Sequence, residues 1–351
     1  MELTALPMRV TGIGAVSPAG WGVQALMDAV RSPACLPIDE VQRVAGALPR
    51  RVRCVPKPVT PLEFARDPRV RRTSPITSYL AAAAFEALGA ERLDDVRGGR
   101  RRVGIIAVML NGCVSFSRRF YGEVRAHPAT ASPLIFPETV FNAPASHFAA
   151  MLGPGLATST LVGDTAQFAA ALDMASLWLE TSEADGVLVV GAEEADWLST
   201  EAVMLFDRRA VVAEGAGSLF LEASREPRVM VQRPLPVSPG HSRGSAARRV
   251  REAWRRSEWF AETETLLCDG LLGSARNDAA EASAFADWTG PRLSAGTCLG
   301  DGLGTRVAWQ CVAAAAMVRA GEVKAAMVPA IGSSQQALGV AFLGSESPTR
   351  S

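Results

Sequence analysis

Histidine is scarce in this chain of 351 residues, which contains three, and the six cysteines include no Cys-x-x-Cys pair. His127, His147 and His241 do not stand at the spacing of metal ligands. The sequence therefore argues against a zinc site, and we expect neither a metal ion nor a cofactor. We interpret all six cysteines as small buried hydrophobic residues of a reducing compartment.

An excess of charge of either sign is also missing. The 36 Lys and Arg residues match 36 Asp and Glu residues, so the composition gives no argument for binding to nucleic acid or to a membrane surface. Residues 1–4 lack the basic region and long apolar stretch of a signal peptide. Apolar runs such as 311–318 are too short to span a bilayer. We expect a cytoplasmic protein with no nucleic-acid partner and no membrane span.

Apolar residues make up 48% of the chain, which is enough for a large core shared by two lobes. The runs 103–108 and 186–191 are apolar without alternation, a pattern typical of strands covered on both faces. Strand and helix signals alternate along the chain and predict a layered α/β fold, with lobes at residues 1–225 and 226–351. Further strands are expected at 158–162, 217–222, 265–268, 324–328 and 338–343, and helices at 78–88, 145–152, 168–180 and 305–320.

Residues 163–167 read Gly-Asp-Thr-Ala-Gln and lie between an apolar run and a helix-like segment. This order of strand, tight turn and helix places residue 167 at a helix N-terminus, where backbone N–H groups and the helix dipole would activate a thiolate. Gln167 stands there instead of cysteine. A carboxamide cannot form a thioester, so the pattern predicts a nucleophile position without its nucleophile.

Five segments, in their order along the chain, resemble those of β-ketoacyl synthases. They are an opening strand at 10–18, a pre-nucleophile segment at 142–154, the turn at 163–167 (Asp-Thr-Ala-Cys in the family), Gly-Ala-Glu-Glu at 191–194, and Asp-Arg at 207–208 with Glu-Gly-Ala-Gly at 214–217. The resemblance implies a thiolase-like fold of two similar lobes around a five-layered α-β-α-β-α core. It also implies a dimer whose central strands pair across the interface, and a shortened second lobe.

The resemblance also assigns the positions of the family's functional residues, and this chain differs at each one. Gln167 replaces the nucleophile, Asp269 and Asp301 replace the two histidines, and Gly296 replaces the lysine. The segment that matches the family's C-terminal gating loop contains Gly332, Ser333 and Ser334.

These replacements oppose condensation, which needs a thiolate to carry the acyl chain and donors to stabilise an enolate. Loss of one preorganised donor costs about 3–4 kcal/mol of transition-state stabilisation. A carboxylate about 4 Å from the enolate adds a repulsion of about 4 kcal/mol at an effective dielectric constant near 20. We therefore expect that the chain does not condense acyl groups.

Glutamine at this turn is found in two kinds of ketosynthase relative. Decarboxylating loading domains keep their histidines, whereas chain length factors do not condense and pair with an active ketosynthase. The aspartates favour the second kind, a subunit for fatty-acid, polyketide or polyene synthesis with a ketosynthase partner and an acyl carrier protein. Two alternatives stay open: a malonyl-thioester decarboxylase or other acyl-thioester enzyme that uses Gln167, Asp269 and Asp301, and a non-catalytic homodimer that binds the carrier protein.

The same residues also have purely structural interpretations. Asp301 is expected to be the N-cap of the helix through residue 320, and Asp269 to stabilise a turn beside Gly270. Gln167 either has a specific role or fills the space of the nucleophile and forms a hydrogen bond to a loop.

Two basic regions are the remaining candidates for a binding surface. Residues 43–72 read as an irregular, solvated segment, and six arginines lie between residues 243 and 256. Arg248 and Arg249 are candidate contacts for a carrier protein or partner subunit, and the alternative is ordinary solvated arginine. Trp254 and Trp259 are either interface anchors or core residues.

Overall fold

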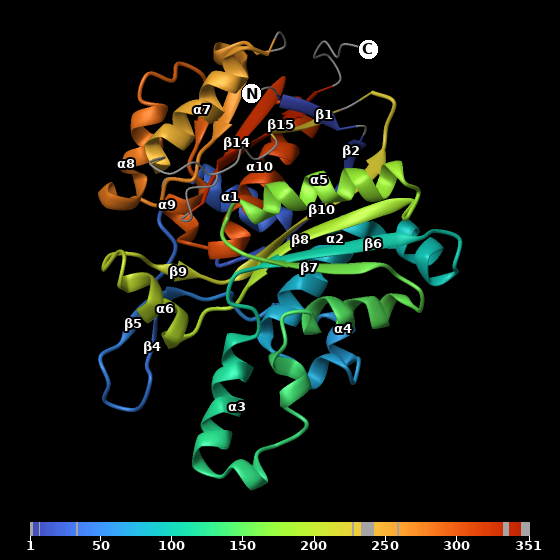
Figure 1. Ribbon diagram of the computed structural model, residues 1–351, viewed down its shortest axis with the longest axis vertical. Coiled ribbons are helices and arrows are strands. Elements are labelled where there is room, and N and C mark those ends of the chain that lie inside the picture. The colour runs from blue at the N-terminus through green and yellow to red at the C-terminus, as the bar shows by residue number, and fades with distance from the viewer. Residues whose placement is uncertain are drawn as a thin grey trace.

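Two six-stranded sheets form the framework of the protein (Figure 1). The computed structural model describes residues 3–6, 8–32, 34–226, 228–232, 242–257, 260–332 and 337–344. The first sheet has the order β3 (Gly20–Trp21), β2 (Met8–Ser17), β10 (Gly215–Ala223), β8 (Gly186–Glu193), β6 (Val103–Met109) and β7 (Thr158–Val162). The second has the order β1 (Leu3–Leu6), β11 (Val229–Gln232), β15 (Ala337–Leu343), β14 (Ala325–Ile331), β12 (Thr265–Cys268) and β13 (Arg292–Leu293).

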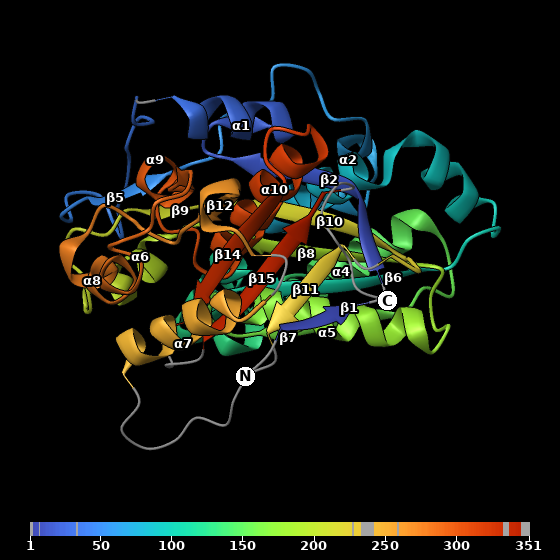
Figure 2. The same ribbon diagram turned by 90° about the horizontal axis from the view of Figure 1, so that it is seen from above.

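Helices form the layers between and outside the sheets (Figures 1 and 2). Helices α5 (Gln167–Glu180) and α10 (Arg306–Arg319) contact strands of both sheets and form the central layer. The outer face of the first sheet is covered by α2 (Pro75–Arg97), on which α4 (Ala143–Leu152) packs. The outer face of the second is covered by α7 (Arg243–Arg255), on which α8 (Ala275–Ala284) packs. The five-layered thiolase-like α/β fold is confirmed.

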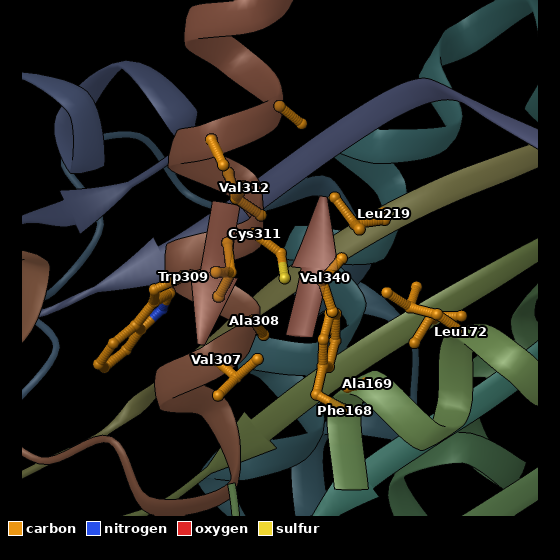
Figure 3. Packing of buried hydrophobic residues seen from close by; sticks show 14 of the residues in the cluster. Phe168, Ala169, Leu172, Leu219, Val307, Ala308, Trp309, Cys311, Val312 and Val340 are labelled. Atoms are coloured by element: carbon orange, nitrogen blue, oxygen red, sulfur yellow. The ribbon is translucent and has the colours of Figure 1, made fainter. Parts of the chain in front are cut away.

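The central layer is almost entirely buried. Residues 307–315 of α10 are all buried, which explains why this helix is apolar around most of its circumference. Side chains of α10 meet Phe168 and Leu172 of α5, Leu219 of β10 and Val340 of β15 (Figure 3).

Two glycines let α10 approach the first sheet closely. A Cβ atom at Gly191 would lie 2.8 Å from the Cβ of Ala308, and one at Gly217 would lie 2.9 Å from it. Larger residues at either strand position would push the helix away from the sheet. The glycines therefore set the position of α10, whose first residue is part of the site described below.

Most of the elements expected from the sequence are present with small changes of boundary. The helix expected at 78–88 extends over Pro75–Arg97, with a break at Gly89, whose φ is 72°. Among the other helices are α1 (Val23–Arg31), α3 (Val114–Ala126), α6 (Trp197–Met204) and α9 (Ala295–Leu299).

The division into lobes at residues 1–225 and 226–351 stays a prediction, but one strand crosses it. β1 pairs antiparallel with β11, with Leu3 opposite Gln232, so the N-terminal strand belongs to the second sheet. None of the described helices is long and apolar enough to cross a bilayer.

The structure corrects two expectations about polar and sulfur-containing residues. Segment 43–72 is not wholly irregular and solvated, because β5 (Arg50–Arg53) pairs with β9 (Val212–Ala213) and β4 (Asp39–Val41), and Arg53 is buried. The expectation that all six cysteines are buried is also wrong, since Cys35 is exposed and Cys54 is half-buried.

Candidate functional site

The turn between β7 and α5 has the strand–turn–helix geometry expected from the sequence, and α5 begins at Gln167. The Asp164 carboxylate accepts a hydrogen bond from the backbone N–H of Ala166 at 3.1 Å. The Asp164 carbonyl accepts one from the N–H of Gln167 at 3.0 Å. Thr165 donates its hydroxyl to the carbonyl of Ile331 at the end of β14, which ties the turn to the second sheet. These contacts hold residue 167 at the helix N-terminus.

The Gln167 side chain folds back over Gly163. A Cβ atom at residue 163 would lie 2.4 Å from Gln167 Cγ and 3.0 Å from Nε2, so only glycine leaves room for this conformation. The carboxamide forms no hydrogen bond with the described residues. The structure therefore supports a space-filling position on a cavity wall and offers no described loop acceptor for this amide.

A cavity of about 750 Å³ opens beside Gln167. Asp301 lies on the same wall as Gln167, as the alignment with the family's site expects. Asp269 and Gly296 do not line this cavity. The described wall contains neither cysteine nor histidine and consists of Leu110, Asn111, Gly163, Asp164, Gln167, Ser199, Ala202, Val203, Phe206, Arg243, Gly270, Leu272, Arg276, Asn277, Asp278, Glu281, Asp301, Leu303 and Arg306.

Asp269 is fully buried at the end of β12 and points to a different partner. Its carboxylate accepts a hydrogen bond from the guanidinium of Arg292 on β13 and one from the backbone N–H of Leu271 at 3.2 Å. The second contact is the turn-stabilising role considered from the sequence. Because both interactions occupy the carboxylate, Asp269 is a structural residue behind the cavity wall.

Asp301 is not the N-cap of α10, and this expectation was wrong. The N-cap is Thr305, while the Asp301 carboxylate accepts from the backbone N–H of Leu303 at 3.0 Å. Leu303 begins the short 3₁₀ turn Leu303–Thr305, whose N-cap is Gly302. This turn lies between Asp301 and the first residue of α10, so Asp301 is too far along the chain to be the N-cap of the helix. Arg306 Nη1 lies 3.6 Å from the same carboxylate, so the charge of Asp301 is partly balanced inside the cavity.

Three arginines on the wall were missed as site residues by the sequence analysis: Arg243, Arg276 and Arg306. Arg243 Nε is buried with no hydrogen-bond acceptor among the described residues. Arg306 donates to Thr165 at 3.4 Å in addition to its pairing with Asp301. The sequence places Arg243 in a basic run but does not connect it with Arg276 and Arg306, because the three belong to α7, α8 and α10 and converge only in the fold.

Glu281 of α8 is the cavity's buried acid. It accepts a hydrogen bond from the backbone N–H of Gly270 at 2.7 Å. Burial raises the pKa of Glu281 to about 7, and this effect outweighs the hydrogen bond from Gly270 and the attraction of Arg306 and Arg243. The cavity wall therefore changes charge near neutral pH.

The lysine and gating-loop positions lie close to the site without forming its wall. A Cβ atom at Gly296 in α9 would lie 2.6 Å from the carbonyl oxygen of Leu271, so this position supports the loop after β12. A Cβ atom at Gly332 would lie 2.5 Å from the Asp164 carboxylate, which places the end of β14 against the turn. Ser333 and Ser334 lie outside the described residues.

The arginine run at 243–256 is not one solvated surface. Arg248 is exposed and Arg249 is half-buried, but Arg251 is buried and pairs with Asp287 and Glu262. Trp254 is fully buried against Phe285, so it is a core residue and not an interface anchor. Trp259 lies outside the described residues.

The thiols and imidazoles lie away from this cavity in the described part of the chain. Burial raises the pKa of the Cys113, Cys268 and Cys311 thiols, which keeps them protonated and unreactive. His147 lies 2.9 Å from Glu138 on another part of the fold, and His241 is outside the described residues. The described residues include no group of His, Cys, Asp and Glu able to hold a metal ion.

No protein-family model and no curated protein matches this chain. Several solved structures are similar to it. "The ishigamide ketosynthase/chain length factor" has a TM-score of 0.78 and 22% identity over 96% of this chain and 99% of that one. A β-ketoacyl synthase from Burkholderia phymatum STM815 has a TM-score of 0.75 and 16% identity over 97% of this chain and 99% of that one.

A third similar structure is a complex, described as AntDE:AntF, a type II PKS acyl-carrier protein with its ketosynthase bound to the hexaketide. It has a TM-score of 0.74 and 15% identity over 97% of this chain and 100% of that one. These likenesses, together with the five layers, show that the chain has the thiolase-like fold. Within that fold class, the chain has the fold shared by ketosynthases and chain length factors.

Proposed function

We propose that this chain is a non-condensing subunit of the chain length factor type that pairs with an active ketosynthase in fatty-acid, polyketide or polyene synthesis. One observation carries the proposal: Gln167 occupies the helix start at which the family has its nucleophile. The cavity beside it has no thiol and no imidazole on its described wall.

The chemistry of this wall supports the absence of condensation. An acyl chain cannot be transferred to the Gln167 carboxamide, and the buried thiols are too far from their ionised form to replace it. Asp301 adds a carboxylate to the cavity wall, and an ionised carboxylate cannot donate a hydrogen bond to an enolate. Asp269 is held by Arg292, so it contributes no donor either.

The open edge of the first sheet supports a protein partner. Among the described strands, β7 is the last of this sheet and pairs only with β6, which leaves one row of its backbone N–H and C=O groups without a ladder there. Val162 at its end is 48% exposed, and Phe141, also exposed, lies against Gly112 just after β6. Exposed apolar residues beside a strand edge are typical of an interface. Others in the neighbouring α3 region, which projects from the molecule in Figure 1, are Tyr121, Leu134, Phe136 and Val140.

The two alternatives are affected differently by the geometry. A malonyl-thioester decarboxylase using Gln167, Asp269 and Asp301 has only the first and the last of these on the cavity wall. A carrier-protein-binding homodimer remains compatible with the same strand edge. Arg248, which is exposed on α7, remains a candidate carrier contact in both non-catalytic proposals, with Arg249 beside it.

Co-expression tests the partner. The chain is produced with the ketosynthase encoded nearest to it, provided that this partner has an intact cysteine and two histidines, and the complex is isolated through a tag on the partner. We expect a stoichiometric heterodimer that condenses acyl groups. A homodimer that does not bind the ketosynthase but decarboxylates malonyl thioester favours the decarboxylase. A homodimer without activity favours the carrier-binding alternative.

A further inference from the structure

A second, smaller cavity contains an arginine that is buried without a counter-charge. Arg53, at the end of β5, is only 6% exposed. Its guanidinium forms no hydrogen bond and no ion pair with the described residues, and its Nε atom is shielded from solvent. Buried arginines are almost always paired, because an isolated charge is expensive to remove from water.

The groups around Arg53 do not balance its charge. Burial lowers the pKa of Arg53, and the like charge of Arg51 lowers it further. Cys298 and Cys35 could balance this charge only as thiolates, and burial raises the pKa of the Cys298 thiol. Arg53 therefore keeps five N–H donors with no described acceptor.

The cavity beside it has a volume of about 230 Å³ and is rich in donors. Arg51 and Arg209, both exposed, lie on its wall with Arg53, and a Cβ atom at Gly300 would lie 3.4 Å from Arg53 Nη1. The complete wall is Arg51, Arg53, Asp207, Arg209, Ala210, Val211, Leu272, Gly273, Ser274, Thr297, Gly300 and Asp301.

The two carboxylates on this wall already have other partners. Asp207 accepts hydrogen bonds from the Ser274 hydroxyl, from Asn277 Nδ2 at 2.9 Å and from the backbone N–H of Arg209 at 2.9 Å. Asp301 accepts a hydrogen bond from the backbone N–H of Leu303 and faces Arg306. The acids are engaged while the guanidinium of Arg53 is not, so the site has a surplus of donors.

We propose that this small cavity binds an oxyanion, the phosphate or carboxylate group of a small ligand, with Arg53 as its buried anchor and Arg51 and Arg209 at its rim. The planar guanidinium matches the oxygen pairs of both groups and forms strong charge-assisted hydrogen bonds with them. The volume suits one small anionic group. Gln167 does not line this cavity, although Leu272 and Asp301 lie on the walls of both cavities. The proposal does not depend on the pairing with a ketosynthase.

The thermal midpoint of the purified chain tests this site. Inorganic phosphate is titrated against chloride at constant ionic strength, with acetate as the carboxylate arm. A ligand that binds only the folded state raises the midpoint in a saturable manner. We expect such a shift with phosphate, acetate or both, and the stronger of the two identifies the anionic group. No shift beyond chloride with either probe overturns the proposal.

Three variants identify the residues responsible. Arg53→Met removes the buried charge and keeps an unbranched apolar stem, and it is expected to weaken binding at least tenfold. Arg209→Gln, at the exposed rim, is expected to weaken binding without affecting folding, so it tests the site even if Arg53→Met does not fold. Arg208→Gln is the matched control, because Arg208 is exposed and adjacent but does not line the cavity. Equal binding by wild type and Arg209→Gln contradicts the assignment, as does an equal loss in the Arg208→Gln control.

Discussion

The guanidinium of Arg292 on β13 pairs with the carboxylate of Asp269 at the end of the adjacent strand β12. Asp269 is fully buried, whereas the Arg292 side chain is 32% exposed. Arg292→Ala would leave a buried carboxylate without its counter-charge, which we expect to lower the free energy of unfolding by about 3 kcal/mol. Urea unfolding of the variant measures this loss.

The double variant Arg292→Ala/Asp269→Asn serves as the control for this pair. Because Asp269→Asn removes the unpaired buried carboxylate, the double variant is expected to be more stable than Arg292→Ala alone. A loss below about 0.5 kcal/mol for Arg292→Ala, the range of ordinary surface substitutions, would show that the pair is not structural.

Restoring the nucleophile alone is expected not to restore condensation. In Gln167→Cys the new thiol stands at the start of α5 and near Arg306, an environment that favours a thiolate. We expect rapid alkylation of this cysteine by iodoacetamide, detected by mass spectrometry, with no condensation of malonyl and acyl thioesters. Cys113 and Cys268, which are buried, provide slow internal controls. Condensation by this single variant would show that the cavity retains the donors that we find missing.

Glu281 gives the protein a specific pH dependence. Its pKa rises from the ordinary value of 4.5 to about 7 in the folded protein. The folded state therefore holds a proton that the unfolded state releases, so the stability contributed by this group is complete below about pH 4.5 and is lost as the pH rises through 7. The loss is on the order of 3 kcal/mol.

Glu281→Gln keeps an oxygen for the N–H of Gly270 but cannot ionise. Its free energy of unfolding is expected to fall less than that of the wild type between about pH 5 and pH 8, as measured by urea unfolding. Other buried acids, such as Glu193, titrate equally in both proteins, so the difference between the two curves isolates Glu281. Parallel curves would contradict a raised pKa at this residue.

A charge on the open strand edge is expected to prevent assembly with the ketosynthase. Val162→Asp places a carboxylate at the end of β7, where the valine is 48% exposed, so folding of the isolated chain changes by less than about 0.5 kcal/mol. Co-purification with the partner is expected to be lost. Leu48→Asp, at an exposed apolar position in the loop between β4 and β5, should retain the complex. Loss of assembly in both variants, or in neither, would place the interface elsewhere.

The sequence predicts the strands, the helices and the turn at Gln167 because each depends on a local pattern. Apolar runs without alternation identify β6 and β8, and the strand–turn–helix order identifies the start of α5. The side-chain directions at Asp269 and Asp301 depend instead on long-range partners. Arg292 turns Asp269 away from the cavity, and the turn Leu303–Thr305 separates Asp301 from α10.

The arginines of both cavities were not predictable for the same reason. Arg243 and Arg306 belong to different helices, and only their packing directs them to one wall. Arg53 belongs to a segment whose composition suggests solvated loop, and its burial results from the pairing of β5 with β9, more than 150 residues away along the chain. Local charge does not reveal which of many arginines is buried.

Release of labelled carbon dioxide from a malonyl thioester by the purified chain tests the central claim most directly. The wild type and Gln167→Ala are measured alone and in complex with the ketosynthase. The account predicts that neither protein alone releases carbon dioxide above the buffer rate, and that release in the complex requires the partner's two histidines. Release by the isolated wild type that disappears in Gln167→Ala would contradict it.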